Sequence, residues 1–193
     1  PWNVWPDVSD AFQGMEGEDN AGIHIHVSRT AFERNGTWSA AHLWKFLQLH
    51  YRNGYAFARL AGRMGSSYAS WNPVDDRFKA KKNSRKYDSD DRYRVINVNN
   101  DATVECRYFQ ADERKEAILS NIELVHAAVE YTRDLDATDV RGGALGFKSF
   151  YIWYAARSGT YPNLCNTTRE QGPVNAFIEA CATYAKRDDE LVK

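Results

Sequence analysis

The sequence predicts an α+β domain in which an antiparallel sheet packs against helices. Two stretches, residues 23–28 and 103–109, alternate apolar and polar side chains with the period of a half-buried strand. Residues 93–98 form a third strand pattern, and the Asn-Asn-Asp turn that follows joins it to the 103–109 strand as a hairpin. Longer stretches repeat apolar residues at helical spacing. These observations favour a single domain over residues 1–193.

Length and composition limit the classes of protein that fit. The 193 residues suffice for one core, and 43% hydrophobic with 26% charged residues is ordinary for a globular protein. The net charge of -1 argues against a nucleic-acid partner, and the lack of a long apolar run argues against a membrane partner. Three widely spaced cysteines predict a reducing, cytoplasmic setting, or the host cytoplasm if a phage encodes the chain.

The elements are expected in a simple order along the chain. Residues 1–20 form an irregular lead-in to the first strand. Ser39 is a predicted N-cap, and Leu43, Leu47 and Tyr51 follow it at helical spacing through about residue 53. Further helices are expected at about 56–64, 112–133, 147–157 and 174–186.

Two later stretches are less regular. Pro162 and Pro173 bracket an expected loop within the otherwise helical C-terminal part, residues 134–193. Residues 72–92 carry a basic run followed by three aspartates, which fits either a solvated loop or a mobile basic flap over a polyanionic ligand. Both interpretations stay open at this point.

The residues most suited to chemistry lie on two of the predicted strands. His24 and His26 are two residues apart and therefore point to the same side of their strand. Glu105 and Arg107 repeat this spacing on the second strand. If both strands belong to one sheet, these four side chains line one open surface. A carboxylate with a neutral imidazole can hold Mg²⁺ or Mn²⁺, and an arginine beside them can stabilise charge on a phosphoryl group.

Several common catalytic motifs are absent from the sequence. Nothing matches the P-loop, the GxSxG nucleophile elbow or the HExxH zinc motif. Nucleotide chemistry would therefore need a site lined by the sheet. A metal-dependent hydrolase that uses His24 and His26 without ATP is a further hypothesis, which the lack of a third nearby ligand motif disfavours.

The order of motifs resembles the C-terminal half of the glutamine synthetase-like carboxylate–amine ligases, and their amidoligase branch in particular, which occurs in phage and bacterial genomes. The matching motifs are Ala21-Gly22-Ile23-His24-Ile25-His26-Val27-Ser28, Ser66-Ser67-Tyr68, Asp91-Arg92-Tyr93-Arg94-Val95-Ile96-Asn97-Val98 and Val104-Glu105-Cys106-Arg107. The resemblance covers about residues 21–130. It implies a glutamine synthetase-like fold with ATP and Mg²⁺ (or Mn²⁺) as cofactors.

The resemblance also implies a role for each matching residue. His24 and Glu105 correspond to metal ligands, and His26 would face the acyl phosphate or the substrate. Arg92 and Arg107 would contact phosphate as catalytic residues. The cofactor-binding residues implied by the resemblance are Tyr68, Arg63 and Arg92. The implied reaction phosphorylates a carboxylate of a small molecule or peptide with ATP, and an amine then displaces the phosphate to form an amide.

The chain departs from the family pattern at two places. The family carries a second arginine where Asn97 stands, and its metal site also takes glutamates from an early acidic strand. The upstream candidates are Glu16 and Glu18, in a glycine-rich stretch that lacks a strand pattern. Because the chain begins at Pro1, we expect a fragment or a processed product whose acidic strand lies on residues before Pro1 or in a partner segment. A homo-oligomer is a further expected partner. The alternative is a catalytically inactive relative that serves as a binding or structural protein, in a phage particle for example.

Overall fold

The computed structural model describes residues 22–63, 71, 79–81 and 94–191, and it has the predicted α+β class. Its main sheet contains β1 (Gly22–Ser28), β5 (Thr103–Gln110) and β4 (Ile96–Asn97) in the order β1–β5–β4, and both pairings are antiparallel. The expected hairpin is confirmed, because Ile96 pairs with Cys106. The β4 strand is shorter than the predicted 93–98, and Tyr93 lies outside the described residues.

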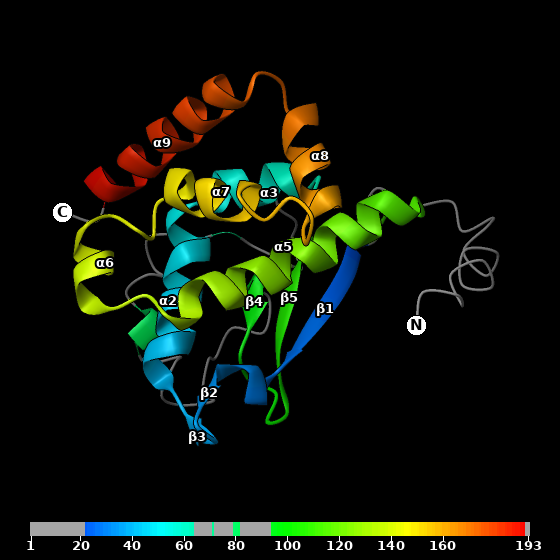
Figure 1. Ribbon diagram of the computed structural model, residues 1–193. Helices are drawn as coiled ribbons and strands as arrows, with labels where there is room; N and C mark the ends of the chain where they lie inside the picture. The colour runs from blue at the N-terminus through cyan, green and yellow to red at the C-terminus, as the bar shows by residue number, and fades with distance from the viewer. Residues whose placement is uncertain (1–21, 64–70, 72–78, 82–93, 192–193) are drawn as a thin grey trace.

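Helices cover one side of this sheet and continue into a second layer (Figure 1). The long helix α5 runs between the sheet and a group formed by α7, α8 and α9, and it contacts α2, α7 and α8. None of the described helices combines the length and apolar character needed to cross a bilayer. The helices are α2 (Ala40–Arg52), α3 (Gly54–Leu60), α5 (Lys115–Arg133), α6 (Ala137–Arg141), α7 (Phe147–Ala155), α8 (Pro162–Glu170) and α9 (Val174–Leu191), with the 3₁₀ turn η2 (Arg29–Phe32) after β1.

The core joins the sheet to α2 and α3 through aromatic side chains. Tyr108 is fully buried and meets His50 of α2 and Phe57 of α3 at ring distances of 5.6 and 6.0 Å. The Tyr108 hydroxyl donates to His50 Nε2 over 3.0 Å, because His50 Nδ1 donates to the Phe46 carbonyl over 2.8 Å. This chain of bonds fixes one neutral form of the imidazole, so a polar pair is satisfied inside an apolar core.

A β-bulge changes the alternation that the sequence predicts for β5. Ile25 pairs with Cys106, but Ile23 pairs with Phe109, so His24 lies opposite two residues of β5, Arg107 and Tyr108. The extra residue resets the phase, and Tyr108 and Phe109 are both buried although they are adjacent. The predicted face is kept, because Glu105 precedes the change and Arg107, which lies within it, is half-buried as Glu105 is.

Most predicted helices are confirmed, with shifted ends. Ser39 is the N-cap of α2 and accepts a hydrogen bond from the backbone N–H of His42, as expected. The helix expected from residue 112 starts at Lys115, and the one expected to end near 186 continues to Leu191.

The prediction of a loop between Pro162 and Pro173 is wrong, because this stretch contains α8. Proline at the first helical position has no N–H to leave unsatisfied, so it favours a helix start there. The carboxylate of Glu123 on α5 then accepts from the backbone N–H of Leu164 and from the Asn163 side chain. Glu123 lies 40 and 41 positions before these two residues in the sequence. A local sequence pattern therefore does not reveal this cap.

Two short elements were not among the predicted ones. A hairpin joins β2 (Glu33–Arg34) to β3 (Thr37–Trp38), and its turn residues Asn35 and Gly36 have φ values of 53° and 71°. Asn-Gly is the typical sequence of such a tight turn. The short helix α6 begins with a capping box made by Asp136 and Asp139. Both elements line a pocket described below.

Replacing Tyr108 with Phe tests the buried polar pair. The Tyr108→Phe variant leaves His50 Nε2 without its donor in the core, so we expect the free energy of unfolding to fall by about 1–2 kcal/mol. Urea denaturation of both proteins measures this. Tyr184→Phe is the matched control, because Tyr184 is 43% exposed and its hydroxyl loss should change stability by less than about 0.5 kcal/mol. Equal stability of the two variants would contradict the role assigned to Tyr108.

The buried histidines also predict acid sensitivity. Burial lowers the pKa of His50 from 6.5 to about 3 and that of His42 from 6.5 to about 4. Below pH 6.5 the unfolded chain therefore binds protons that the folded chain does not. Their contribution to stability is complete above pH 6.5 and declines as the pH falls, with a slope approaching about 1.4 kcal/mol per pH unit for each histidine.

Urea denaturation between pH 7.5 and 4.5, with NMR titration of the imidazole signals, measures this dependence. We expect the His50 signals to stay at their neutral positions throughout that range. The His42→Gln variant should show a shallower loss of stability with falling pH, because one of the two groups no longer titrates. An unchanged slope in that variant would rule out His42 as a source of the acid sensitivity.

Candidate functional site on the open face of the sheet

The predicted meeting of the two polar strand faces is confirmed. β1 and β5 are direct neighbours, and His26 lies opposite Glu105 in the antiparallel register. Along β1 the exposed and half-buried positions alternate, so His24 and His26 share the face turned away from the core. Glu105 and Arg107 reach the same face from β5, between the buried Val104, Cys106 and Tyr108.

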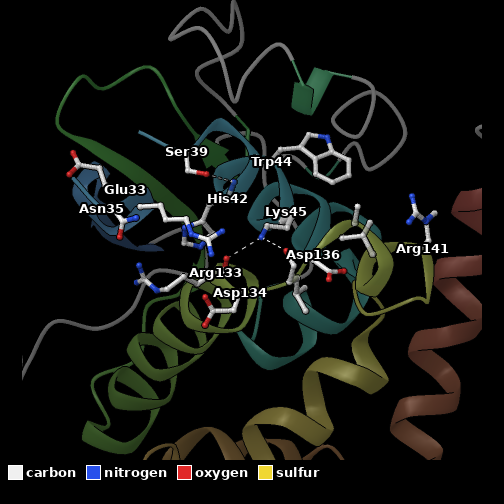
Figure 2. A pocket seen from close by; sticks show the side chains of 15 residues that line it. Glu33, Asn35, Ser39, His42, Trp44, Lys45, Arg133, Asp134, Asp136 and Arg141 are labelled. Atoms are coloured by element: carbon white, nitrogen blue, oxygen red, sulfur yellow. Dashed lines mark hydrogen bonds between the residues drawn. The ribbon is translucent and has the colours of Figure 1, made fainter. Parts of the chain in front are cut away.

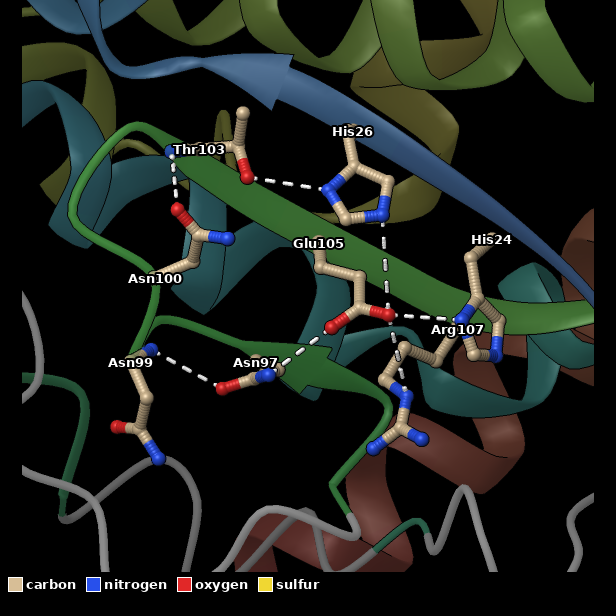
Figure 3. Close-up of polar contacts among 8 residues, drawn as sticks. All are labelled: His24, His26, Asn97, Asn99, Asn100, Thr103, Glu105 and Arg107. Carbon is tan, nitrogen blue, oxygen red and sulfur yellow. Dashed lines mark hydrogen bonds and ion pairs between the residues drawn. The ribbon is translucent and has the colours of Figure 1, made fainter.

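The carboxylate of Glu105 is the centre of this group (Figure 3). Its Oε1 atom lies 2.7 Å from His24 Nδ1, 3.6 Å from Arg107 Nε and 3.9 Å from His26 Nε2. Its Oε2 atom accepts a hydrogen bond of 2.9 Å from the side-chain amide of Asn97. We call Glu105, His24, His26, Arg107 and Asn97 the Glu105 cluster. One negative charge is therefore held between two imidazoles, a guanidinium and an amide.

Asn97 orients the carboxylate from the neighbouring strand β4. The Asn97 side-chain oxygen accepts from the backbone N–H of Asn99 over 3.0 Å, so the amide nitrogen must face Glu105. Thr103 has a similar role for His26, since its hydroxyl lies 3.0 Å from His26 Nδ1. Asn97 and Thr103 were not predicted as members of this group. Strand periodicity could have found Thr103, which lies two residues before Glu105 on the same face.

Accessibility differs sharply among the members of the cluster. The side chains of His24 and His26 are 40% and 48% exposed, whereas those of Glu105 and Arg107 are 13% and 16% exposed. A ligand approaching this face would therefore meet the two imidazoles first. Because His24 Nδ1 faces Glu105, the other ring nitrogen, Nε2, is the one left to bind a ligand.

The electrostatic balance keeps His24 in its neutral form at neutral pH. Burial lowers the pKa of His24 most, and the nearby charges of Arg107 and His26 lower it further. The carboxylate of Glu105 opposes them and raises this pKa, although the net direction is downward. A neutral imidazole retains a lone pair for a cation or a proton, which makes His24 a suitable ligand.

A second guanidinium lies at the start of β1. A side chain at Gly22 would collide with Nη1 of Arg63 and approach its Cζ to 3.1 Å. Gly22 alternates with His24 and His26, so the Arg63 guanidinium packs on the same face as the Glu105 cluster. Arg63 is only 7% exposed. A larger residue at position 22 would require the Arg63 side chain to shift.

Several predicted site residues cannot be placed in this way. Tyr68 and Arg92 lie outside the described residues, as do Glu16, Glu18 and most of the basic stretch 72–92. The described residues therefore bring together five of the predicted positions in one part of the sheet: His24, His26, Glu105, Arg107 and Arg63.

The side chains of the described residues can be compared with the ligands that the expected metal takes. Among the described residues, no group of three or more His, Cys, Asp or Glu side chains is arranged to hold a metal ion. Mg²⁺ commonly takes one or two protein ligands and completes its shell with water and phosphate oxygens, so Glu105 with His24 fits a cation shared with a nucleotide. An imidazole whose far nitrogen bonds a carboxylate is also the usual support of a metal-binding histidine.

Comparisons of the chain with protein-family models, with curated proteins and with solved structures gave no match.

Two substitutions should move the pKa of His24 in opposite directions. Removing the negative charge with Glu105→Gln should lower this pKa further, because Glu105 raises it. Removing the positive charge with Arg107→Gln should raise it, because Arg107 lowers it. NMR titration of the His24 ring signals in the three proteins measures both effects. Shifts of the same sign in the two variants would show that the charges of Glu105 and Arg107 do not control the pKa of His24.

Proposed function

We propose that this chain is an ATP-dependent carboxylate–amine ligase of the amidoligase type, or the catalytic half of one, with a glutamine synthetase-like fold. The observation that carries the proposal is the Glu105 cluster. His24 and Glu105 are far apart in the sequence, yet His24 Nδ1 lies 2.7 Å from Glu105 Oε1 on an open sheet face. The guanidinium groups of Arg107 and Arg63 lie on that same face.

The proposed roles follow from charge and accessibility. The Nε2 atom of His24 would hold Mg²⁺ or Mn²⁺, with Glu105 orienting the imidazole through Nδ1, and the cation would screen the charge of the ATP phosphates. Arg107 and Arg63 would contact phosphate oxygens, which suit the fork of a guanidinium group. His26 is the most exposed of the side chains that contact Glu105 and would face the carboxylate substrate or its acyl phosphate.

The proposed reaction has two steps that balance. A substrate carboxylate oxygen attacks the γ-phosphorus of ATP, which forms the acyl phosphate and releases ADP. An amine then attacks the acyl carbon, phosphate leaves, and the amine loses a proton as the amide forms. As the resemblance implies, Arg92 would contact phosphate and Tyr68 would line the nucleotide pocket. The further carboxylates of such a site would come from a partner segment or another copy of the chain, in the cytoplasm of a bacterium or of a phage host.

A second function is favoured by one specific observation. Both oxygens of Glu105 already have partners, Asn97 on one side and His24 on the other, and the described residues form no group of three or more His, Cys, Asp or Glu side chains that could hold a metal ion. A relative that has lost catalysis and serves as a binding or structural protein would show such a closed network. The ligase function requires the chain to bind ATP together with the cation, whereas the binding or structural function does not.

Thermal unfolding with Mg²⁺ and ATP tests the ligase proposal on the full chain. Ligand at one hundred times its dissociation constant adds about 2.7 kcal/mol of stability, which raises the Tm of a domain of this size by several degrees, about 5–10 °C. We expect this rise with Mg²⁺ and ATP together, a smaller rise with either alone, and none in Glu105→Gln. Glu179→Gln, which changes an exposed glutamate on α9, should behave as the parent protein does.

The result separates the two functions. A full rise in Glu105→Gln would place the nucleotide elsewhere and remove the ligase proposal. No rise in any protein would favour the binding or structural function.

A further inference from the structure

We propose that a second site, between the β2–β3 hairpin, the start of α2 and the junction of α5 with α6, binds a small organic anion that carries a flat apolar group. This site shares no lining residue with the Glu105 cluster. The proposal is independent of the ligase function.

The site is a pocket of about 720 Å³, a size typical of small-molecule sites. Arg34 and Asn35 come from the β2–β3 hairpin, and Trp44 and Lys45 come from α2. The α5–α6 junction supplies the opposite wall, which begins at Arg133. Figure 2 shows Lys45 in the middle of the pocket, with Arg133 and Arg141 on opposite sides of it.

Lys45 supplies a buried positive charge at the base of the pocket. The residue is only 9% exposed. Its ammonium group donates to the carbonyl oxygens of Leu135 and Arg133 over 2.6 and 3.1 Å. Lysine has three such donors, so the third is left for a ligand. The two bonds also offset the partial negative charge of the α5 C-terminus, which would otherwise repel an anion.

Further cations converge on Lys45. Burial lowers the pKa of Lys45 most and the nearby positive charge of Arg34 lowers it further, although the carboxylates of Asp134, Asp139 and Asp136 oppose this shift. Within the described part of the chain, Arg34 makes no hydrogen bond or ion pair, whereas Arg133 is paired with Glu130 over 2.6 Å. An anion bound in this pocket would be attracted by both Lys45 and Arg34.

The acidic side chains of the pocket do not cancel this charge at its base. Asp134 and Asp136 are exposed, so water screens them, and Glu33 is a half-buried residue of the β2–β3 hairpin. Asp136 is also engaged by the backbone N–H groups of Thr138 and Asp139, where it caps α6. Asp136 also raises the pKa of Lys45, but among the charged side chains that line the pocket Lys45 is the buried one.

Apolar surfaces next to these charges define the rest of the ligand. The half-buried Trp44 presents an indole ring, and Leu135 and Val140 are half-buried on the opposite wall. A flat apolar group can stack on an indole ring while an attached anionic group reaches Lys45. An aromatic carboxylate and an aromatic phosphate monoester both have this chemistry.

Titration of the full chain with benzoate, phenyl phosphate and benzyl alcohol tests the proposal. The indole N–H signal of Trp44 in ¹H–¹⁵N NMR spectra, assigned with Trp44→Phe, reports binding. We expect both anions to shift this signal saturably and the neutral alcohol to bind at least about tenfold more weakly. The stronger of the two anions identifies the charge group, carboxylate or phosphate, that the site prefers.

Charge variants locate the bound anion. Arg34→Gln should weaken binding of the preferred anion by about three- to tenfold, and Lys45→Met by more, because the buried ammonium is lost. Arg157→Gln is the matched control, since Arg157 stacks on Trp153 outside the pocket and its loss should not change the affinity. Because Lys45 also binds two carbonyls, Arg34→Gln keeps the test decisive if Lys45→Met fails to fold.

Two results would overturn the inference. Benzyl alcohol that binds as tightly as benzoate would make the pocket a purely apolar one. Equal effects of Arg34→Gln and Arg157→Gln would show that only the overall charge of the protein matters.

Discussion

Pairing between β1 and β5 is the interaction on which the rest of the described structure depends. It joins segments about eighty residues apart, and a slip of one residue would turn the His24 side of β1 into the core. The apolar faces oppose that slip, because Ile25 pairs with the buried Cys106 and Val27 with the buried Val104. The Glu105 cluster is therefore a consequence of core packing on the opposite side of the same strands.

Helix α2 transmits this arrangement to the remaining helices. Near its C-terminal end, His50 binds the Tyr108 hydroxyl and so fixes the helix against β5. Near its start, His42 donates to the Val129 carbonyl and Lys45 to the carbonyls at the end of α5. These three polar side chains of α2 thus position the sheet on one side and the pocket lined by Lys45, the Lys45 pocket, on the other. Each satisfies buried carbonyl or hydroxyl groups that would otherwise be costly.

The sequence predicts the parts of this structure that depend on short-range periodicity. Alternation along β1 and β5 places His24, His26, Glu105 and Arg107 correctly, and Ser39 marks the start of α2. The hairpin at Asn35 carries a clear Asn-Gly signal that a search for strands of ordinary length overlooks.

Tertiary contacts explain the predictions that fail or are incomplete. Helix α8 was expected to be a loop because its cap, Glu123, lies on another helix. The bulge opposite Ile23 and the bond from Asn97 to Glu105 depend on how two strands meet, which neither strand encodes alone. The Lys45 pocket is likewise built from segments whose meeting no local pattern indicates. Local chemistry is readable from the sequence, whereas the partners that orient it are a product of the fold.

The geometry of the Glu105 cluster limits how a cation can bind there. A cation held by Glu105 Oε1 and His24 Nδ1 would have to break their 2.7 Å contact. A cation held by His24 Nε2 would keep this contact, and Glu105 would then orient the imidazole from behind. The second arrangement preserves the bond from Asn97 and requires no movement of a side chain that is only 13% exposed. Asn97, which donates to Oε2 of Glu105, therefore suits a site in which Glu105 supports a ligand-binding histidine.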